Sequence, residues 1–480
     1  MDKADDLDRY LIRRKKIDPE FARGYAAGHE KFKIGILMKQ ARQDAGLTQE
    51  ELARRLRALT ASAISPIIIS LRARARTRSR EGPPMPLSKA PMITVEEALA
   101  AVERAKVAPR PESVPLPKAL GRILAKDVVS RIAMPPFDKS AMDGYACRAG
   151  DPSSRLRVVE MIPAGGVPAK SVKRGECAKI MTGGMIPRGA GRVVRRELAV
   201  EEDSVVRFTG ADEASNICRK GEDVRPGDVV LRKGALIRPQ EIGILASMGA
   251  ADIKVFERPA VGVIATGSEI VTPGRPLPPG RIYDSNSYSL AAQVERCGVG
   301  VKLRRRAADT PAGIRRAVAT ALESCGLVLV SGGVSAGDLD YVPAVLRSLG
   351  VRLAFEQVAV QPGKPTVFGT RGGAIVFGVP GNPVSTFVVF EVFIKPVLFR
   401  MMGHAWKPLT VTGTLTRPIL RRRTERAAFV PVRVDGDVVD RPEYHGSAHI
   451  QALSGANGLV YVPKGEEGFP EGSRVHVRLL

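Results

Sequence analysis

The sequence predicts a multidomain α/β protein built around a doubly wound, mostly parallel sheet. Between residues 258 and 403, apolar runs rich in Val, Ile and Leu alternate with amphipathic stretches of helical length. That alternation is typical of βαβ units. Short strand-like runs punctuated by Gly and Pro precede this region, and further alternating runs follow it. They predict elongated α+β and β modules before the central domain and a C-terminal β-barrel-like domain after it.

Changes of pattern divide the 480 residues into five parts. At about 150 residues per domain, this length allows roughly three domains, so some of the parts are small. The parts are a helical extension, 1–85; an elongated linker domain made from two segments, 86–128 and 216–257; a β-rich lid domain, 129–215; the α/β domain, 258–403; and a C-terminal β domain, 404–480.

The N-terminal extension resembles a truncated helix-turn-helix of the Cro-type antitoxins. Residues 34–56 have apolar residues at helical spacing, with a break at Gly46. Thr48 and Glu51 form a capping box for a second helix. Pro66 then falls where the recognition helix would continue, and proline removes a backbone donor and disfavours helix for its predecessor. We therefore expect a relic or an accidental fusion rather than a sequence-specific DNA-binding module, and whether it is ordered stays open.

Four strands and four helices are expected in the α/β domain. The strands are 260–266, 300–305, 327–331 and 374–379, and the helices are 285–298, 309–322, 338–350 and 382–403. The expected N-caps are Asn286, Thr310, Asn382 and either Asp338 or Asp340. Before this domain, Thr94 and Glu97 form a capping box that opens a helix reaching about residue 107.

Polar clusters follow every predicted strand of the α/β domain at its carboxyl end. They are Thr266, Gly267, Ser268 and Glu269 after the first strand; Asp309 after the second; Ser331, Gly332, Gly333, Asp338 and Asp340 after the third; and Pro380, Gly381, Asn382 and Pro383 after the last. Ligands of open α/β sheets bind outside the carboxyl ends of the strands. The clusters therefore predict one binding site at this edge.

The residue types at this edge suit a phosphate together with a magnesium ion. Backbone N–H groups of Ser331-Gly332-Gly333 would approach a phosphate closely, and the helix N-termini after Asp338 and Asn382 add favourable dipoles. Lys364, in QPGKP, offers a positive charge. Mg²⁺ prefers carboxylate oxygens. Its candidate ligands are Glu269, Asp309, Asp338 and Asp340. A simple helix cap is the alternative for both aspartates, and it is favoured for Asp338.

The composition limits the function classes. A net charge of +24 invites a nucleic-acid partner, but the aromatic content of 5% argues against stacking platforms for nucleic acid. No apolar run approaches the ~20 residues that span a bilayer, and the charged N-terminus does not resemble a signal peptide. The five cysteines are far apart and suit reduced packing thiols. We expect a cytoplasmic protein without a membrane or nucleic-acid partner.

Five motifs occur in order along the chain after residue 86. They are MPPFDKSAMDGYA, ATGSEIV followed by GRIYDSNSYSL, SGGVSAGDLDY, QPGKP and GVPGNPVS. Together they resemble the molybdopterin molybdotransferases, the bacterial molybdenum-insertion enzymes similar to the C-terminal catalytic domain of gephyrin. The resemblance spans about residues 87–480, so that 258–403 would be the molybdopterin-binding domain.

The resemblance implies the reaction and the partners. Such enzymes bind adenylylated molybdopterin and, with Mg²⁺ and molybdate, release AMP and load the metal onto the dithiolene. A pyrophosphate, a divalent ion and an oxyanion would then share one pocket, where electrostatic positioning is the expected device. The family also implies a homodimer with a cleft between domains of both chains, and molybdopterin adenylyltransferase as pathway partner.

The resemblance also implies site residues. The catalytic candidates are Asp138, Thr182, Asp223, Glu269, Asp340 and Lys364. Asp138 and Thr182 would face the cleft from the lid domain. Pro380 and Pro383 would frame the turn that shapes the pocket. Ser447, in GSAHIQALSGANG, would contact the substrate from the partner subunit.

Three positions depart from the family pattern. Gln361 stands where many relatives carry Lys before Pro-Gly-Lys, so one positive charge at the oxyanion site is missing. Cys218 replaces a commoner Arg, and Gly191 replaces an acid. Two alternatives stay open beside the enzyme: a DNA-binding regulator that senses pterin or molybdate, and a catalytically weakened scaffold. Molybdate and tungstate are near-isosteric, so the choice of oxyanion also stays open.

Overall fold

The computed structural model describes residues 91–151, 155–210, 213–335 and 340–480. The expected N-terminal helices, 1–85, and Asp338 lie outside these ranges. Within them, no helix is long and apolar enough to cross a bilayer.

The α/β domain contains one mixed six-stranded sheet. In spatial order its strands are β16 (Val301–Ala307), β13 (Val261–Thr266), β17 (Leu327–Ser331), β21 (Ala374–Val379), β20 (Val367–Arg371) and β18 (Arg352–Phe355). The first four strands are parallel; β20 pairs antiparallel with β21, and β18 pairs antiparallel with β20. The four predicted strands are thus confirmed to within two residues, and the sheet is mostly parallel as expected.

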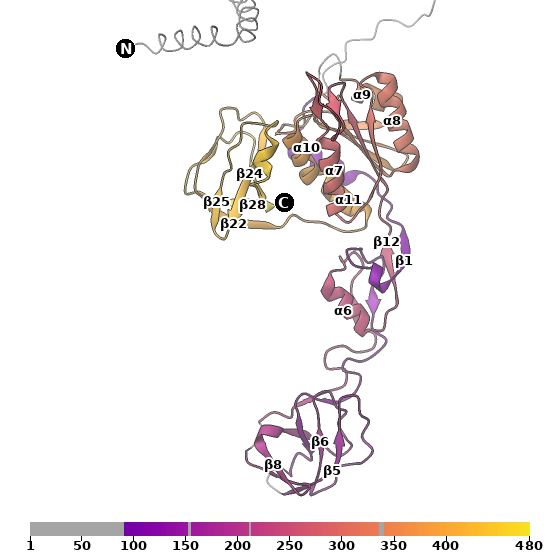
Figure 1. Cartoon of the computed structure of the whole chain (residues 1–480), viewed down its shortest axis with the longest axis vertical. Coiled ribbons are helices and arrows are strands. Elements are labelled where there is room, and N and C mark those ends of the chain that lie inside the picture. Colours follow the sequence, from indigo (N-terminus) through magenta and orange to yellow (C-terminus); the bar gives the residue numbers. More distant parts are fainter. Residues whose placement is uncertain (1–90, 152–154, 211–212, 336–339) are drawn as a thin grey trace, which may run out of the picture. The chain divides into compact units, whose positions relative to one another are not determined.

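Helices cover both faces of this sheet, as a doubly wound fold requires (Figure 1). One face carries α8 (Pro311–Ser324) and α9 (Val342–Ser348). The other carries α7 (Asn286–Arg296), α10 (Pro383–Val389) and α11 (Lys395–Met401). Strand β17 shows the reason, because its side chains alternate between the faces: Leu327 and Leu329 pack in one core, and Val328 and Val330 pack in the other.

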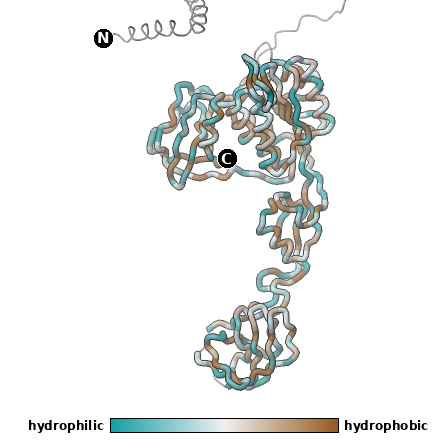
Figure 2. The backbone as a smooth tube through the Cα atoms, in the orientation of Figure 1, coloured by the Kyte–Doolittle hydropathy of each residue, from teal (hydrophilic) through white to brown (hydrophobic). Residues whose placement is uncertain are grey.

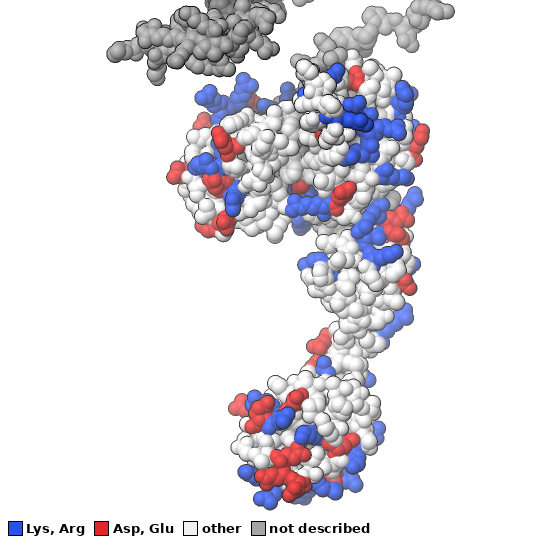
Figure 3. Space-filling model, in the orientation of Figure 1, with Lys and Arg blue, Asp and Glu red and all other residues white. Residues whose placement is uncertain are grey.

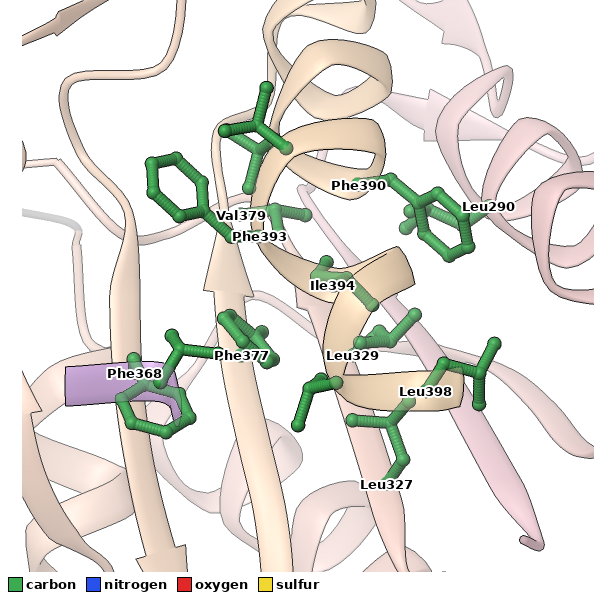
Figure 4. Packing of buried hydrophobic residues seen from close by; sticks show 14 of the residues in the cluster. Leu290, Leu327, Leu329, Phe368, Phe377, Val379, Phe390, Phe393, Ile394 and Leu398 are labelled. Atoms are coloured by element: carbon green, nitrogen blue, oxygen red, sulfur yellow. The ribbon is translucent and has the colours of Figure 1, made fainter. Parts of the chain in front are cut away.

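The larger core contains aromatic and branched side chains from sheet and helices (Figure 4). Phe377 and Phe368 from neighbouring strands lie with ring centroids 4.9 Å apart. Phe390, Phe393 and Ile394 from the helical side are buried against the sheet. Figure 2 shows the hydrophobic stretches of this domain at its centre. Burial of each such side chain stabilises the fold by roughly 1.5–3 kcal/mol before entropy costs.

Two helices differ from expectation. The helix expected from residue 338 begins at Val342, and Tyr341 is its N-cap, so Asp340 is not the cap. The helix expected over 382–403 contains one π-helical segment, η3 (Phe390–Ile394), between α10 and α11. Pro396 contributes to this break, because proline lacks the N–H that would continue the α-helical pattern. The capping box of α5 (Val95–Arg104) is confirmed: Thr94 Oγ1 accepts from Glu97 N at 3.1 Å.

The C-terminal β domain is a closed five-stranded barrel. Its strands are β22 (Thr410–Leu415), β24 (Ala427–Asp435), β25 (Val438–Asp440), β26 (Gly458–Val462) and β28 (Arg474–Leu479). The ring closes because β24 pairs with both β25 and β26. A short strand of the α/β domain, β19 (Val360–Gln361), pairs in parallel with β24. The segment that contains QPGKP is therefore hydrogen-bonded to the barrel.

Residues 111–257 form the linker and lid modules, which precede the first strand of the central sheet in the sequence. Strands β1 (Pro111–Pro115) and β12 (Asp252–Phe256) pair antiparallel and pack with helix α6 (Pro239–Ser247) and β11 (Val229–Leu231), which pairs with β2 (Val128–Val129). The residues that lie between β2 and β11 in the sequence form the six-stranded sheet of the lid domain. Its spatial order is β7 (Arg192–Arg195), β4 (Gly144–Cys147), β6 (Glu176–Ile180), β5 (Leu156–Ile162), β9 (Val205–Phe208) and β8 (Ala199–Glu202). A two-strand ladder of β3 (Lys139–Ser140) and β10 (Ile217–Cys218) adjoins the lid sheet.

Candidate active site

The largest group of predicted site residues lines one cavity of about 880 Å³ at the carboxyl edge of the central sheet. The parallel strands have the order β16, β13, β17, β21: β16 is added on one side of β13 and β17 on the other, so the order of strand addition reverses at β13. Such a topological switch point leaves a crevice between the loops that follow the two strands. The predicted residues that line the cavity are Thr266, Gly267, Glu269, Asp309, Ser331, Gly332, Gly333, Asp340, Gly381, Asn382 and Pro383. The residues predicted to form one site at this edge of the sheet therefore line a single cavity.

The turn after β13 brings an acid against the glycine next to it. A Cβ on Gly267 would lie 2.7 Å from Glu269 Oε1, so only glycine lets this carboxylate fold back over the turn. Thr266 Oγ1 donates to Asp309 Oδ1 at 2.9 Å, which fixes the carboxylate that follows β16. Ser268 is exposed and is not among the residues that line the cavity.

The turn after β17 is the tightest part of the site. Gly332 has a φ of +94°, and a Cβ there would lie 2.3 Å from the Thr266 carbonyl oxygen. The expectation that its N–H faces a phosphate is wrong, because Gly332 N donates to Val379 O at 3.1 Å. The glycine serves instead to let β13 and β17 approach each other. Gly333 O accepts from Val342 N at 3.0 Å and so connects this turn to α9.

The turn after β21 is held from three directions. Thr386 Oγ1 donates to Pro380 O at 2.5 Å. Asn382 Nδ2 donates to Ser447 Oγ at 2.8 Å, and Val384 N donates to Ser447 O at 3.0 Å. Asn382 is at the N-cap position of α10, but its side chain bonds Ser447 rather than the helix. Pro380 itself is buried behind the turn.

The loop that contains Ser447 belongs to the cavity of its own chain. Ala448, Ile450 and Gln451 line the cavity directly, and Ser447 supports the turn from behind. The resemblance placed this loop at the substrate of the partner subunit. Within one chain, the pairing of the barrel with β19 brings 447–451 to this edge, and the contact with the partner subunit stays a prediction.

Asn286 is the site residue that sequence reasoning missed. It was expected as the N-cap of α7, but Asp284 performs that role: its carboxylate accepts from Ser287 N at 3.0 Å and from Ser287 Oγ at 2.5 Å. Asn286 Nδ2 instead donates to Ser331 Oγ at 2.9 Å and to Gly381 O at 2.7 Å. The sequence offered two signs of a site role for Asn286, its amide side chain and its position shortly after β15 (Ile282–Tyr283). Both signs are equally typical of a helix N-cap, so they did not single it out.

Four carboxylates line the cavity, those of Glu269, Asp284, Asp309 and Asp340. The Asp284 carboxylate is used by Ser287 at the start of α7, which leaves Glu269, Asp309 and Asp340 as candidate ligands. Within the described ranges, no group of three or more His, Cys, Asp or Glu side chains is arranged to hold a metal ion. Mg²⁺ in proteins usually takes one or two carboxylates and completes its shell with water and substrate phosphates. The donor types in the cavity fit that pattern.

A second cavity, of about 370 Å³, lies on the other side of the QPGKP segment. It is rich in arginine, and its lining includes Gln361, Pro362, Arg421, Arg422, Arg423, Arg426 and Arg441. Arg421 is anchored by donating to the carbonyl oxygens of Arg426 and Pro463. Pro365 lines the first cavity, and Lys364 between the two is exposed. One short segment, 361–365, therefore contributes to both an acid-lined cavity and an arginine-lined one.

The lid-side candidates lie apart from this cavity within their own chain. Asp138 accepts from Lys220 N at 2.8 Å and from Arg219 at 2.9 Å, and these contacts lower its pKa. Thr182 donates its N–H and its hydroxyl to Asp143 Oδ1, both at 2.7 Å, and lowers the pKa of that carboxyl. Asp223 lines a separate cavity of about 740 Å³ with Met134, beside α6. None of the three is among the residues that line the cavity at the sheet edge.

Family models match the described chain from end to end. They are "MoeA N-terminal region (domain I and II)" at residues 93–249, "Probable molybdopterin binding domain" at 262–400, and "MoeA C-terminal region (domain IV)" at 413–480. The second match spans the central sheet, apart from the first residue of β13, and the three turns of the cavity.

Relatives align over nearly their whole length. A Mycobacterium tuberculosis protein named molybdopterin molybdenumtransferase 2 is 37% identical over 406 residues, 80% of this chain and 99% of the relative. A Staphylococcus aureus molybdopterin molybdenumtransferase is 34% identical over 415 residues, 82% of this chain and 97% of the relative. The solved structure of a molybdopterin biosynthesis MoeA protein from Pyrococcus horikoshii is 31% identical, has a TM-score of 0.72, and covers 81% of this chain and 100% of its own. This chain belongs to the MoeA family of molybdopterin molybdenumtransferases.

Proposed function

We propose that this chain is a transferase of molybdenum-cofactor biosynthesis that inserts molybdate into adenylylated molybdopterin and releases AMP. The relatives that align over 80% or more of the chain are named for molybdenum transfer to molybdopterin. One observation supports the proposal most: the acid-lined cavity and the arginine-lined cavity share the segment 361–365. An oxyanion is best held by positively charged side chains, whereas the Mg²⁺ on a pyrophosphate is best held by carboxylates. The arginine-lined and the acid-lined cavity supply these two surroundings, and one segment contributes to both.

The cavity at the sheet edge would bind the nucleotide-linked pterin. Its volume of about 880 Å³ is in the range of small-molecule sites, and backbone turns from three strands line it. Glu269, Asp309 and Asp340 would hold Mg²⁺ there, and the ion would neutralise charge on the pyrophosphate. The protein's own contribution is to orient the scissile phosphoanhydride and to exclude water.

The arginine-lined cavity would receive the oxyanion. Guanidinium groups supply several N–H donors in a fixed plane and suit tetrahedral oxyanions. Gln361 lies in this lining where many relatives carry Lys. The surrounding arginines keep the cavity positive despite that departure, so the weakened-scaffold alternative is not favoured. Both molybdate and tungstate fit this description, and the choice between them is part of the test.

The DNA-binding alternative is not favoured either. All three family matches lie within residues 93–480, and the helix-turn-helix resemblance lies before them. In the view of Figure 3, both signs of charge occur on the lid, the α/β domain and the barrel. We further propose a cytoplasmic homodimer in which Asp138, Thr182 and Asp223 complete the cavity of the partner subunit. A molybdopterin adenylyltransferase would supply the substrate.

Nucleotide release tests the proposal directly. The purified protein is incubated with adenylylated molybdopterin, Mg²⁺ and either molybdate or tungstate, and AMP is measured by chromatography. We expect AMP release that depends on both Mg²⁺ and the oxyanion. Asp340→Asn and Lys364→Ala should each abolish it, whereas the matched changes Asp252→Asn and Lys254→Ala on β12 should not. Oxyanion-independent release, or no release by the unaltered chain, would refute the proposal.

A further inference from the structure

Asn286 connects three segments that are far apart in the sequence. Its amide nitrogen donates to Ser331 Oγ at the end of β17 and to Gly381 O in the turn after β21. Ser331 Oγ in turn donates to Pro380 O at 3.4 Å. One side chain at the start of α7 therefore bonds both the turn after β17 and the turn after β21, which line the cavity together.

The orientation of this amide is fixed by its partners. Gly381 O accepts only, so the amide nitrogen rather than the oxygen must face it. Both N–H bonds are then used, and Asn286 Oδ1 is buried without a hydrogen-bond partner among the described residues. A buried acceptor without a partner lowers stability and is uncommon in folded proteins. Its presence in a cavity wall indicates that the position serves the ligand rather than the fold.

The two turns are in close contact where Asn286 joins them. A Cβ on Gly381 would lie 4.0 Å from Gly332 Cα, so the two glycine-containing turns are neighbours. The two turns are also joined directly by the bonds from Gly332 N to Val379 O and from Ser331 Oγ to Pro380 O. The amide of Asn286 adds a connection from α7.

The rest of α7 holds Asn286 in place. Gln293 Nε2 donates to Glu391 Oε1 at 3.0 Å and to Phe387 O at 3.3 Å, which ties α7 to α10 and η3. Glu391 is itself buried and paired with Lys395 at 2.7 Å. Helices α7 and α10 both begin at the cavity, so a bond between their later turns fixes the spacing of their first residues. Asn286 thus projects from a rigid element.

We propose that Asn286 is a positioning residue that sets the spacing of the turns 331–333 and 380–383 so that both contact one pyrophosphate. The inference rests on the proposed function for the identity of the ligand. A ligand with two linked phosphates must touch both turns at once, whereas a single phosphate needs only one of them. Substitution of Asn286 should therefore weaken the binding of ligands with a pyrophosphate more than the binding of ligands with a single phosphate.

Binding of ADP and AMP to the full-length chain tests this selectivity. Asn286→Leu removes both donors with little change in volume, and Asn286→Ala is the second variant should Leu prevent folding. Asn457→Leu is the matched control, because Asn457 bonds the backbone of Val434 in the barrel, outside the cavity. Dissociation constants with Mg²⁺ are measured by calorimetry, and melting temperatures are recorded for each variant.

We expect Asn286→Leu to weaken ADP by about tenfold or more and AMP by less than about threefold, the size of one or two lost hydrogen bonds. Asn457→Leu should leave the ratio of the two constants unchanged. Equal weakening of ADP and AMP, no weakening, or no ADP binding by the unaltered chain would overturn the inference. AMP release from adenylylated molybdopterin is measured separately. If the unaltered chain binds ADP but releases no AMP, the proposed function fails while the ADP-to-AMP ratio still decides the role of Asn286.

Discussion

Asn382 and Ser447 are hydrogen-bonded, with Asn382 Nδ2 donating to Ser447 Oγ at 2.8 Å. The first residue belongs to the turn after β21, and the second belongs to a loop of the C-terminal barrel. Asn286 holds the same turn from the opposite side through Gly381 O. The wall of the cavity is therefore made by two domains of one chain, and each supplies a side chain that bonds the same turn.

Ser447→Ala should weaken substrate binding while leaving the fold intact. The change removes the hydroxyl that accepts from Asn382 but keeps the bond from Val384 N to the Ser447 carbonyl. Loss of one such hydrogen bond corresponds to about 0.5–1.5 kcal/mol, or a roughly three- to tenfold higher KM for adenylylated molybdopterin. The control is Ser454→Ala, whose hydroxyl bonds Gln451 O in the same loop. An unchanged KM for Ser447→Ala, measured by AMP release, would show that the bond does not position the turn.

Gly332→Ala should abolish ligand binding and destabilise the protein. The alanine would need a φ of +94° and would place its Cβ 2.3 Å from Thr266 O. We expect a loss of more than about 2 kcal/mol in the free energy of unfolding, because strain and backbone displacement add. Denaturant unfolding measures it.

Gly243→Ala is the matched control for that prediction. Gly243 lies inside α6, and a Cβ there would meet nothing within 4 Å. Because glycine lowers helix stability, this change should raise stability by about 0.5–1 kcal/mol. If both substitutions changed the free energy of unfolding in the same direction, the steric account of Gly332 would be wrong.

Much of the α/β domain follows from local pattern. The runs at 261–266, 327–331 and 374–379 are mostly apolar and rich in Val and Ile, as buried parallel strands are. The edge strand at 301–307 carries Lys and Arg and is largely exposed. Polar and glycine residues after each strand then predict a site at one edge by topology alone. Thr94 was recognisable as a cap from Glu97 three positions later, and Thr310 from the proline that follows it. In the structure the hydroxyl of each accepts from the backbone N–H three positions on.

Other features depend on tertiary contacts that a single sequence does not display. Asn286 has the residue type of a cap, and only the approach of β17 and the turn after β21 gives its amide other partners. Gly332 was expected to donate to a phosphate, but pairing with Val379 uses its N–H. The arginine-lined cavity joins Gln361 with residues 60 or more positions later, through the pairing of β19 with β24.

Asp309→Asn should raise the Mg²⁺ requirement of the reaction. Thr266 Oγ1 donates to Asp309 Oδ1, so an amide in that position keeps the shape but removes a negative charge beside the nucleotide. Because Mg²⁺ completes its shell with substrate phosphates, we expect the Mg²⁺ concentration for half-maximal AMP release to rise by about tenfold. Asp252→Asn on β12 serves as the control. A Mg²⁺ dependence that does not move would remove Asp309 from the ion's surroundings.

Gln361→Lys should lower the KM for the oxyanion. Gln361 lines the cavity that Arg421, Arg423 and Arg426 also line, and a lysine there restores the charge that many relatives carry. An added charge a few ångströms from the anion contributes about 1 kcal/mol at a solvated site, or roughly a fivefold lower KM for molybdate. Gln240→Lys on the exposed face of α6 controls for net charge. If both variants lower the KM equally, the effect is one of general attraction and the cavity is not the oxyanion site.

Tyr461→Phe should reduce stability at neutral pH and should do so less in acid. The Tyr461 hydroxyl, on barrel strand β26, donates to Glu96 Oε1 at 2.7 Å on helix α5. This bond is the largest cause that lowers the pKa of Glu96. A carboxyl with a lowered pKa in the folded state stabilises the fold above its unfolded pKa of about 4.3. That contribution is lost as the pH falls through the lower folded value.

The two pH regimes make this prediction measurable. At pH 7 we expect Tyr461→Phe to cost about 0.5–1 kcal/mol in unfolding free energy, a small value because Glu96 is exposed and solvent screens it. As the pH falls through the lowered folded pKa of Glu96, the difference between the two proteins should shrink. Tyr288→Phe, which keeps its ring under Arg304, is the control and should show no such pH dependence. Denaturant titrations at both pH values decide it, because a cost that stays constant with pH would mean that the contact between α5 and the barrel does not depend on the Glu96 charge.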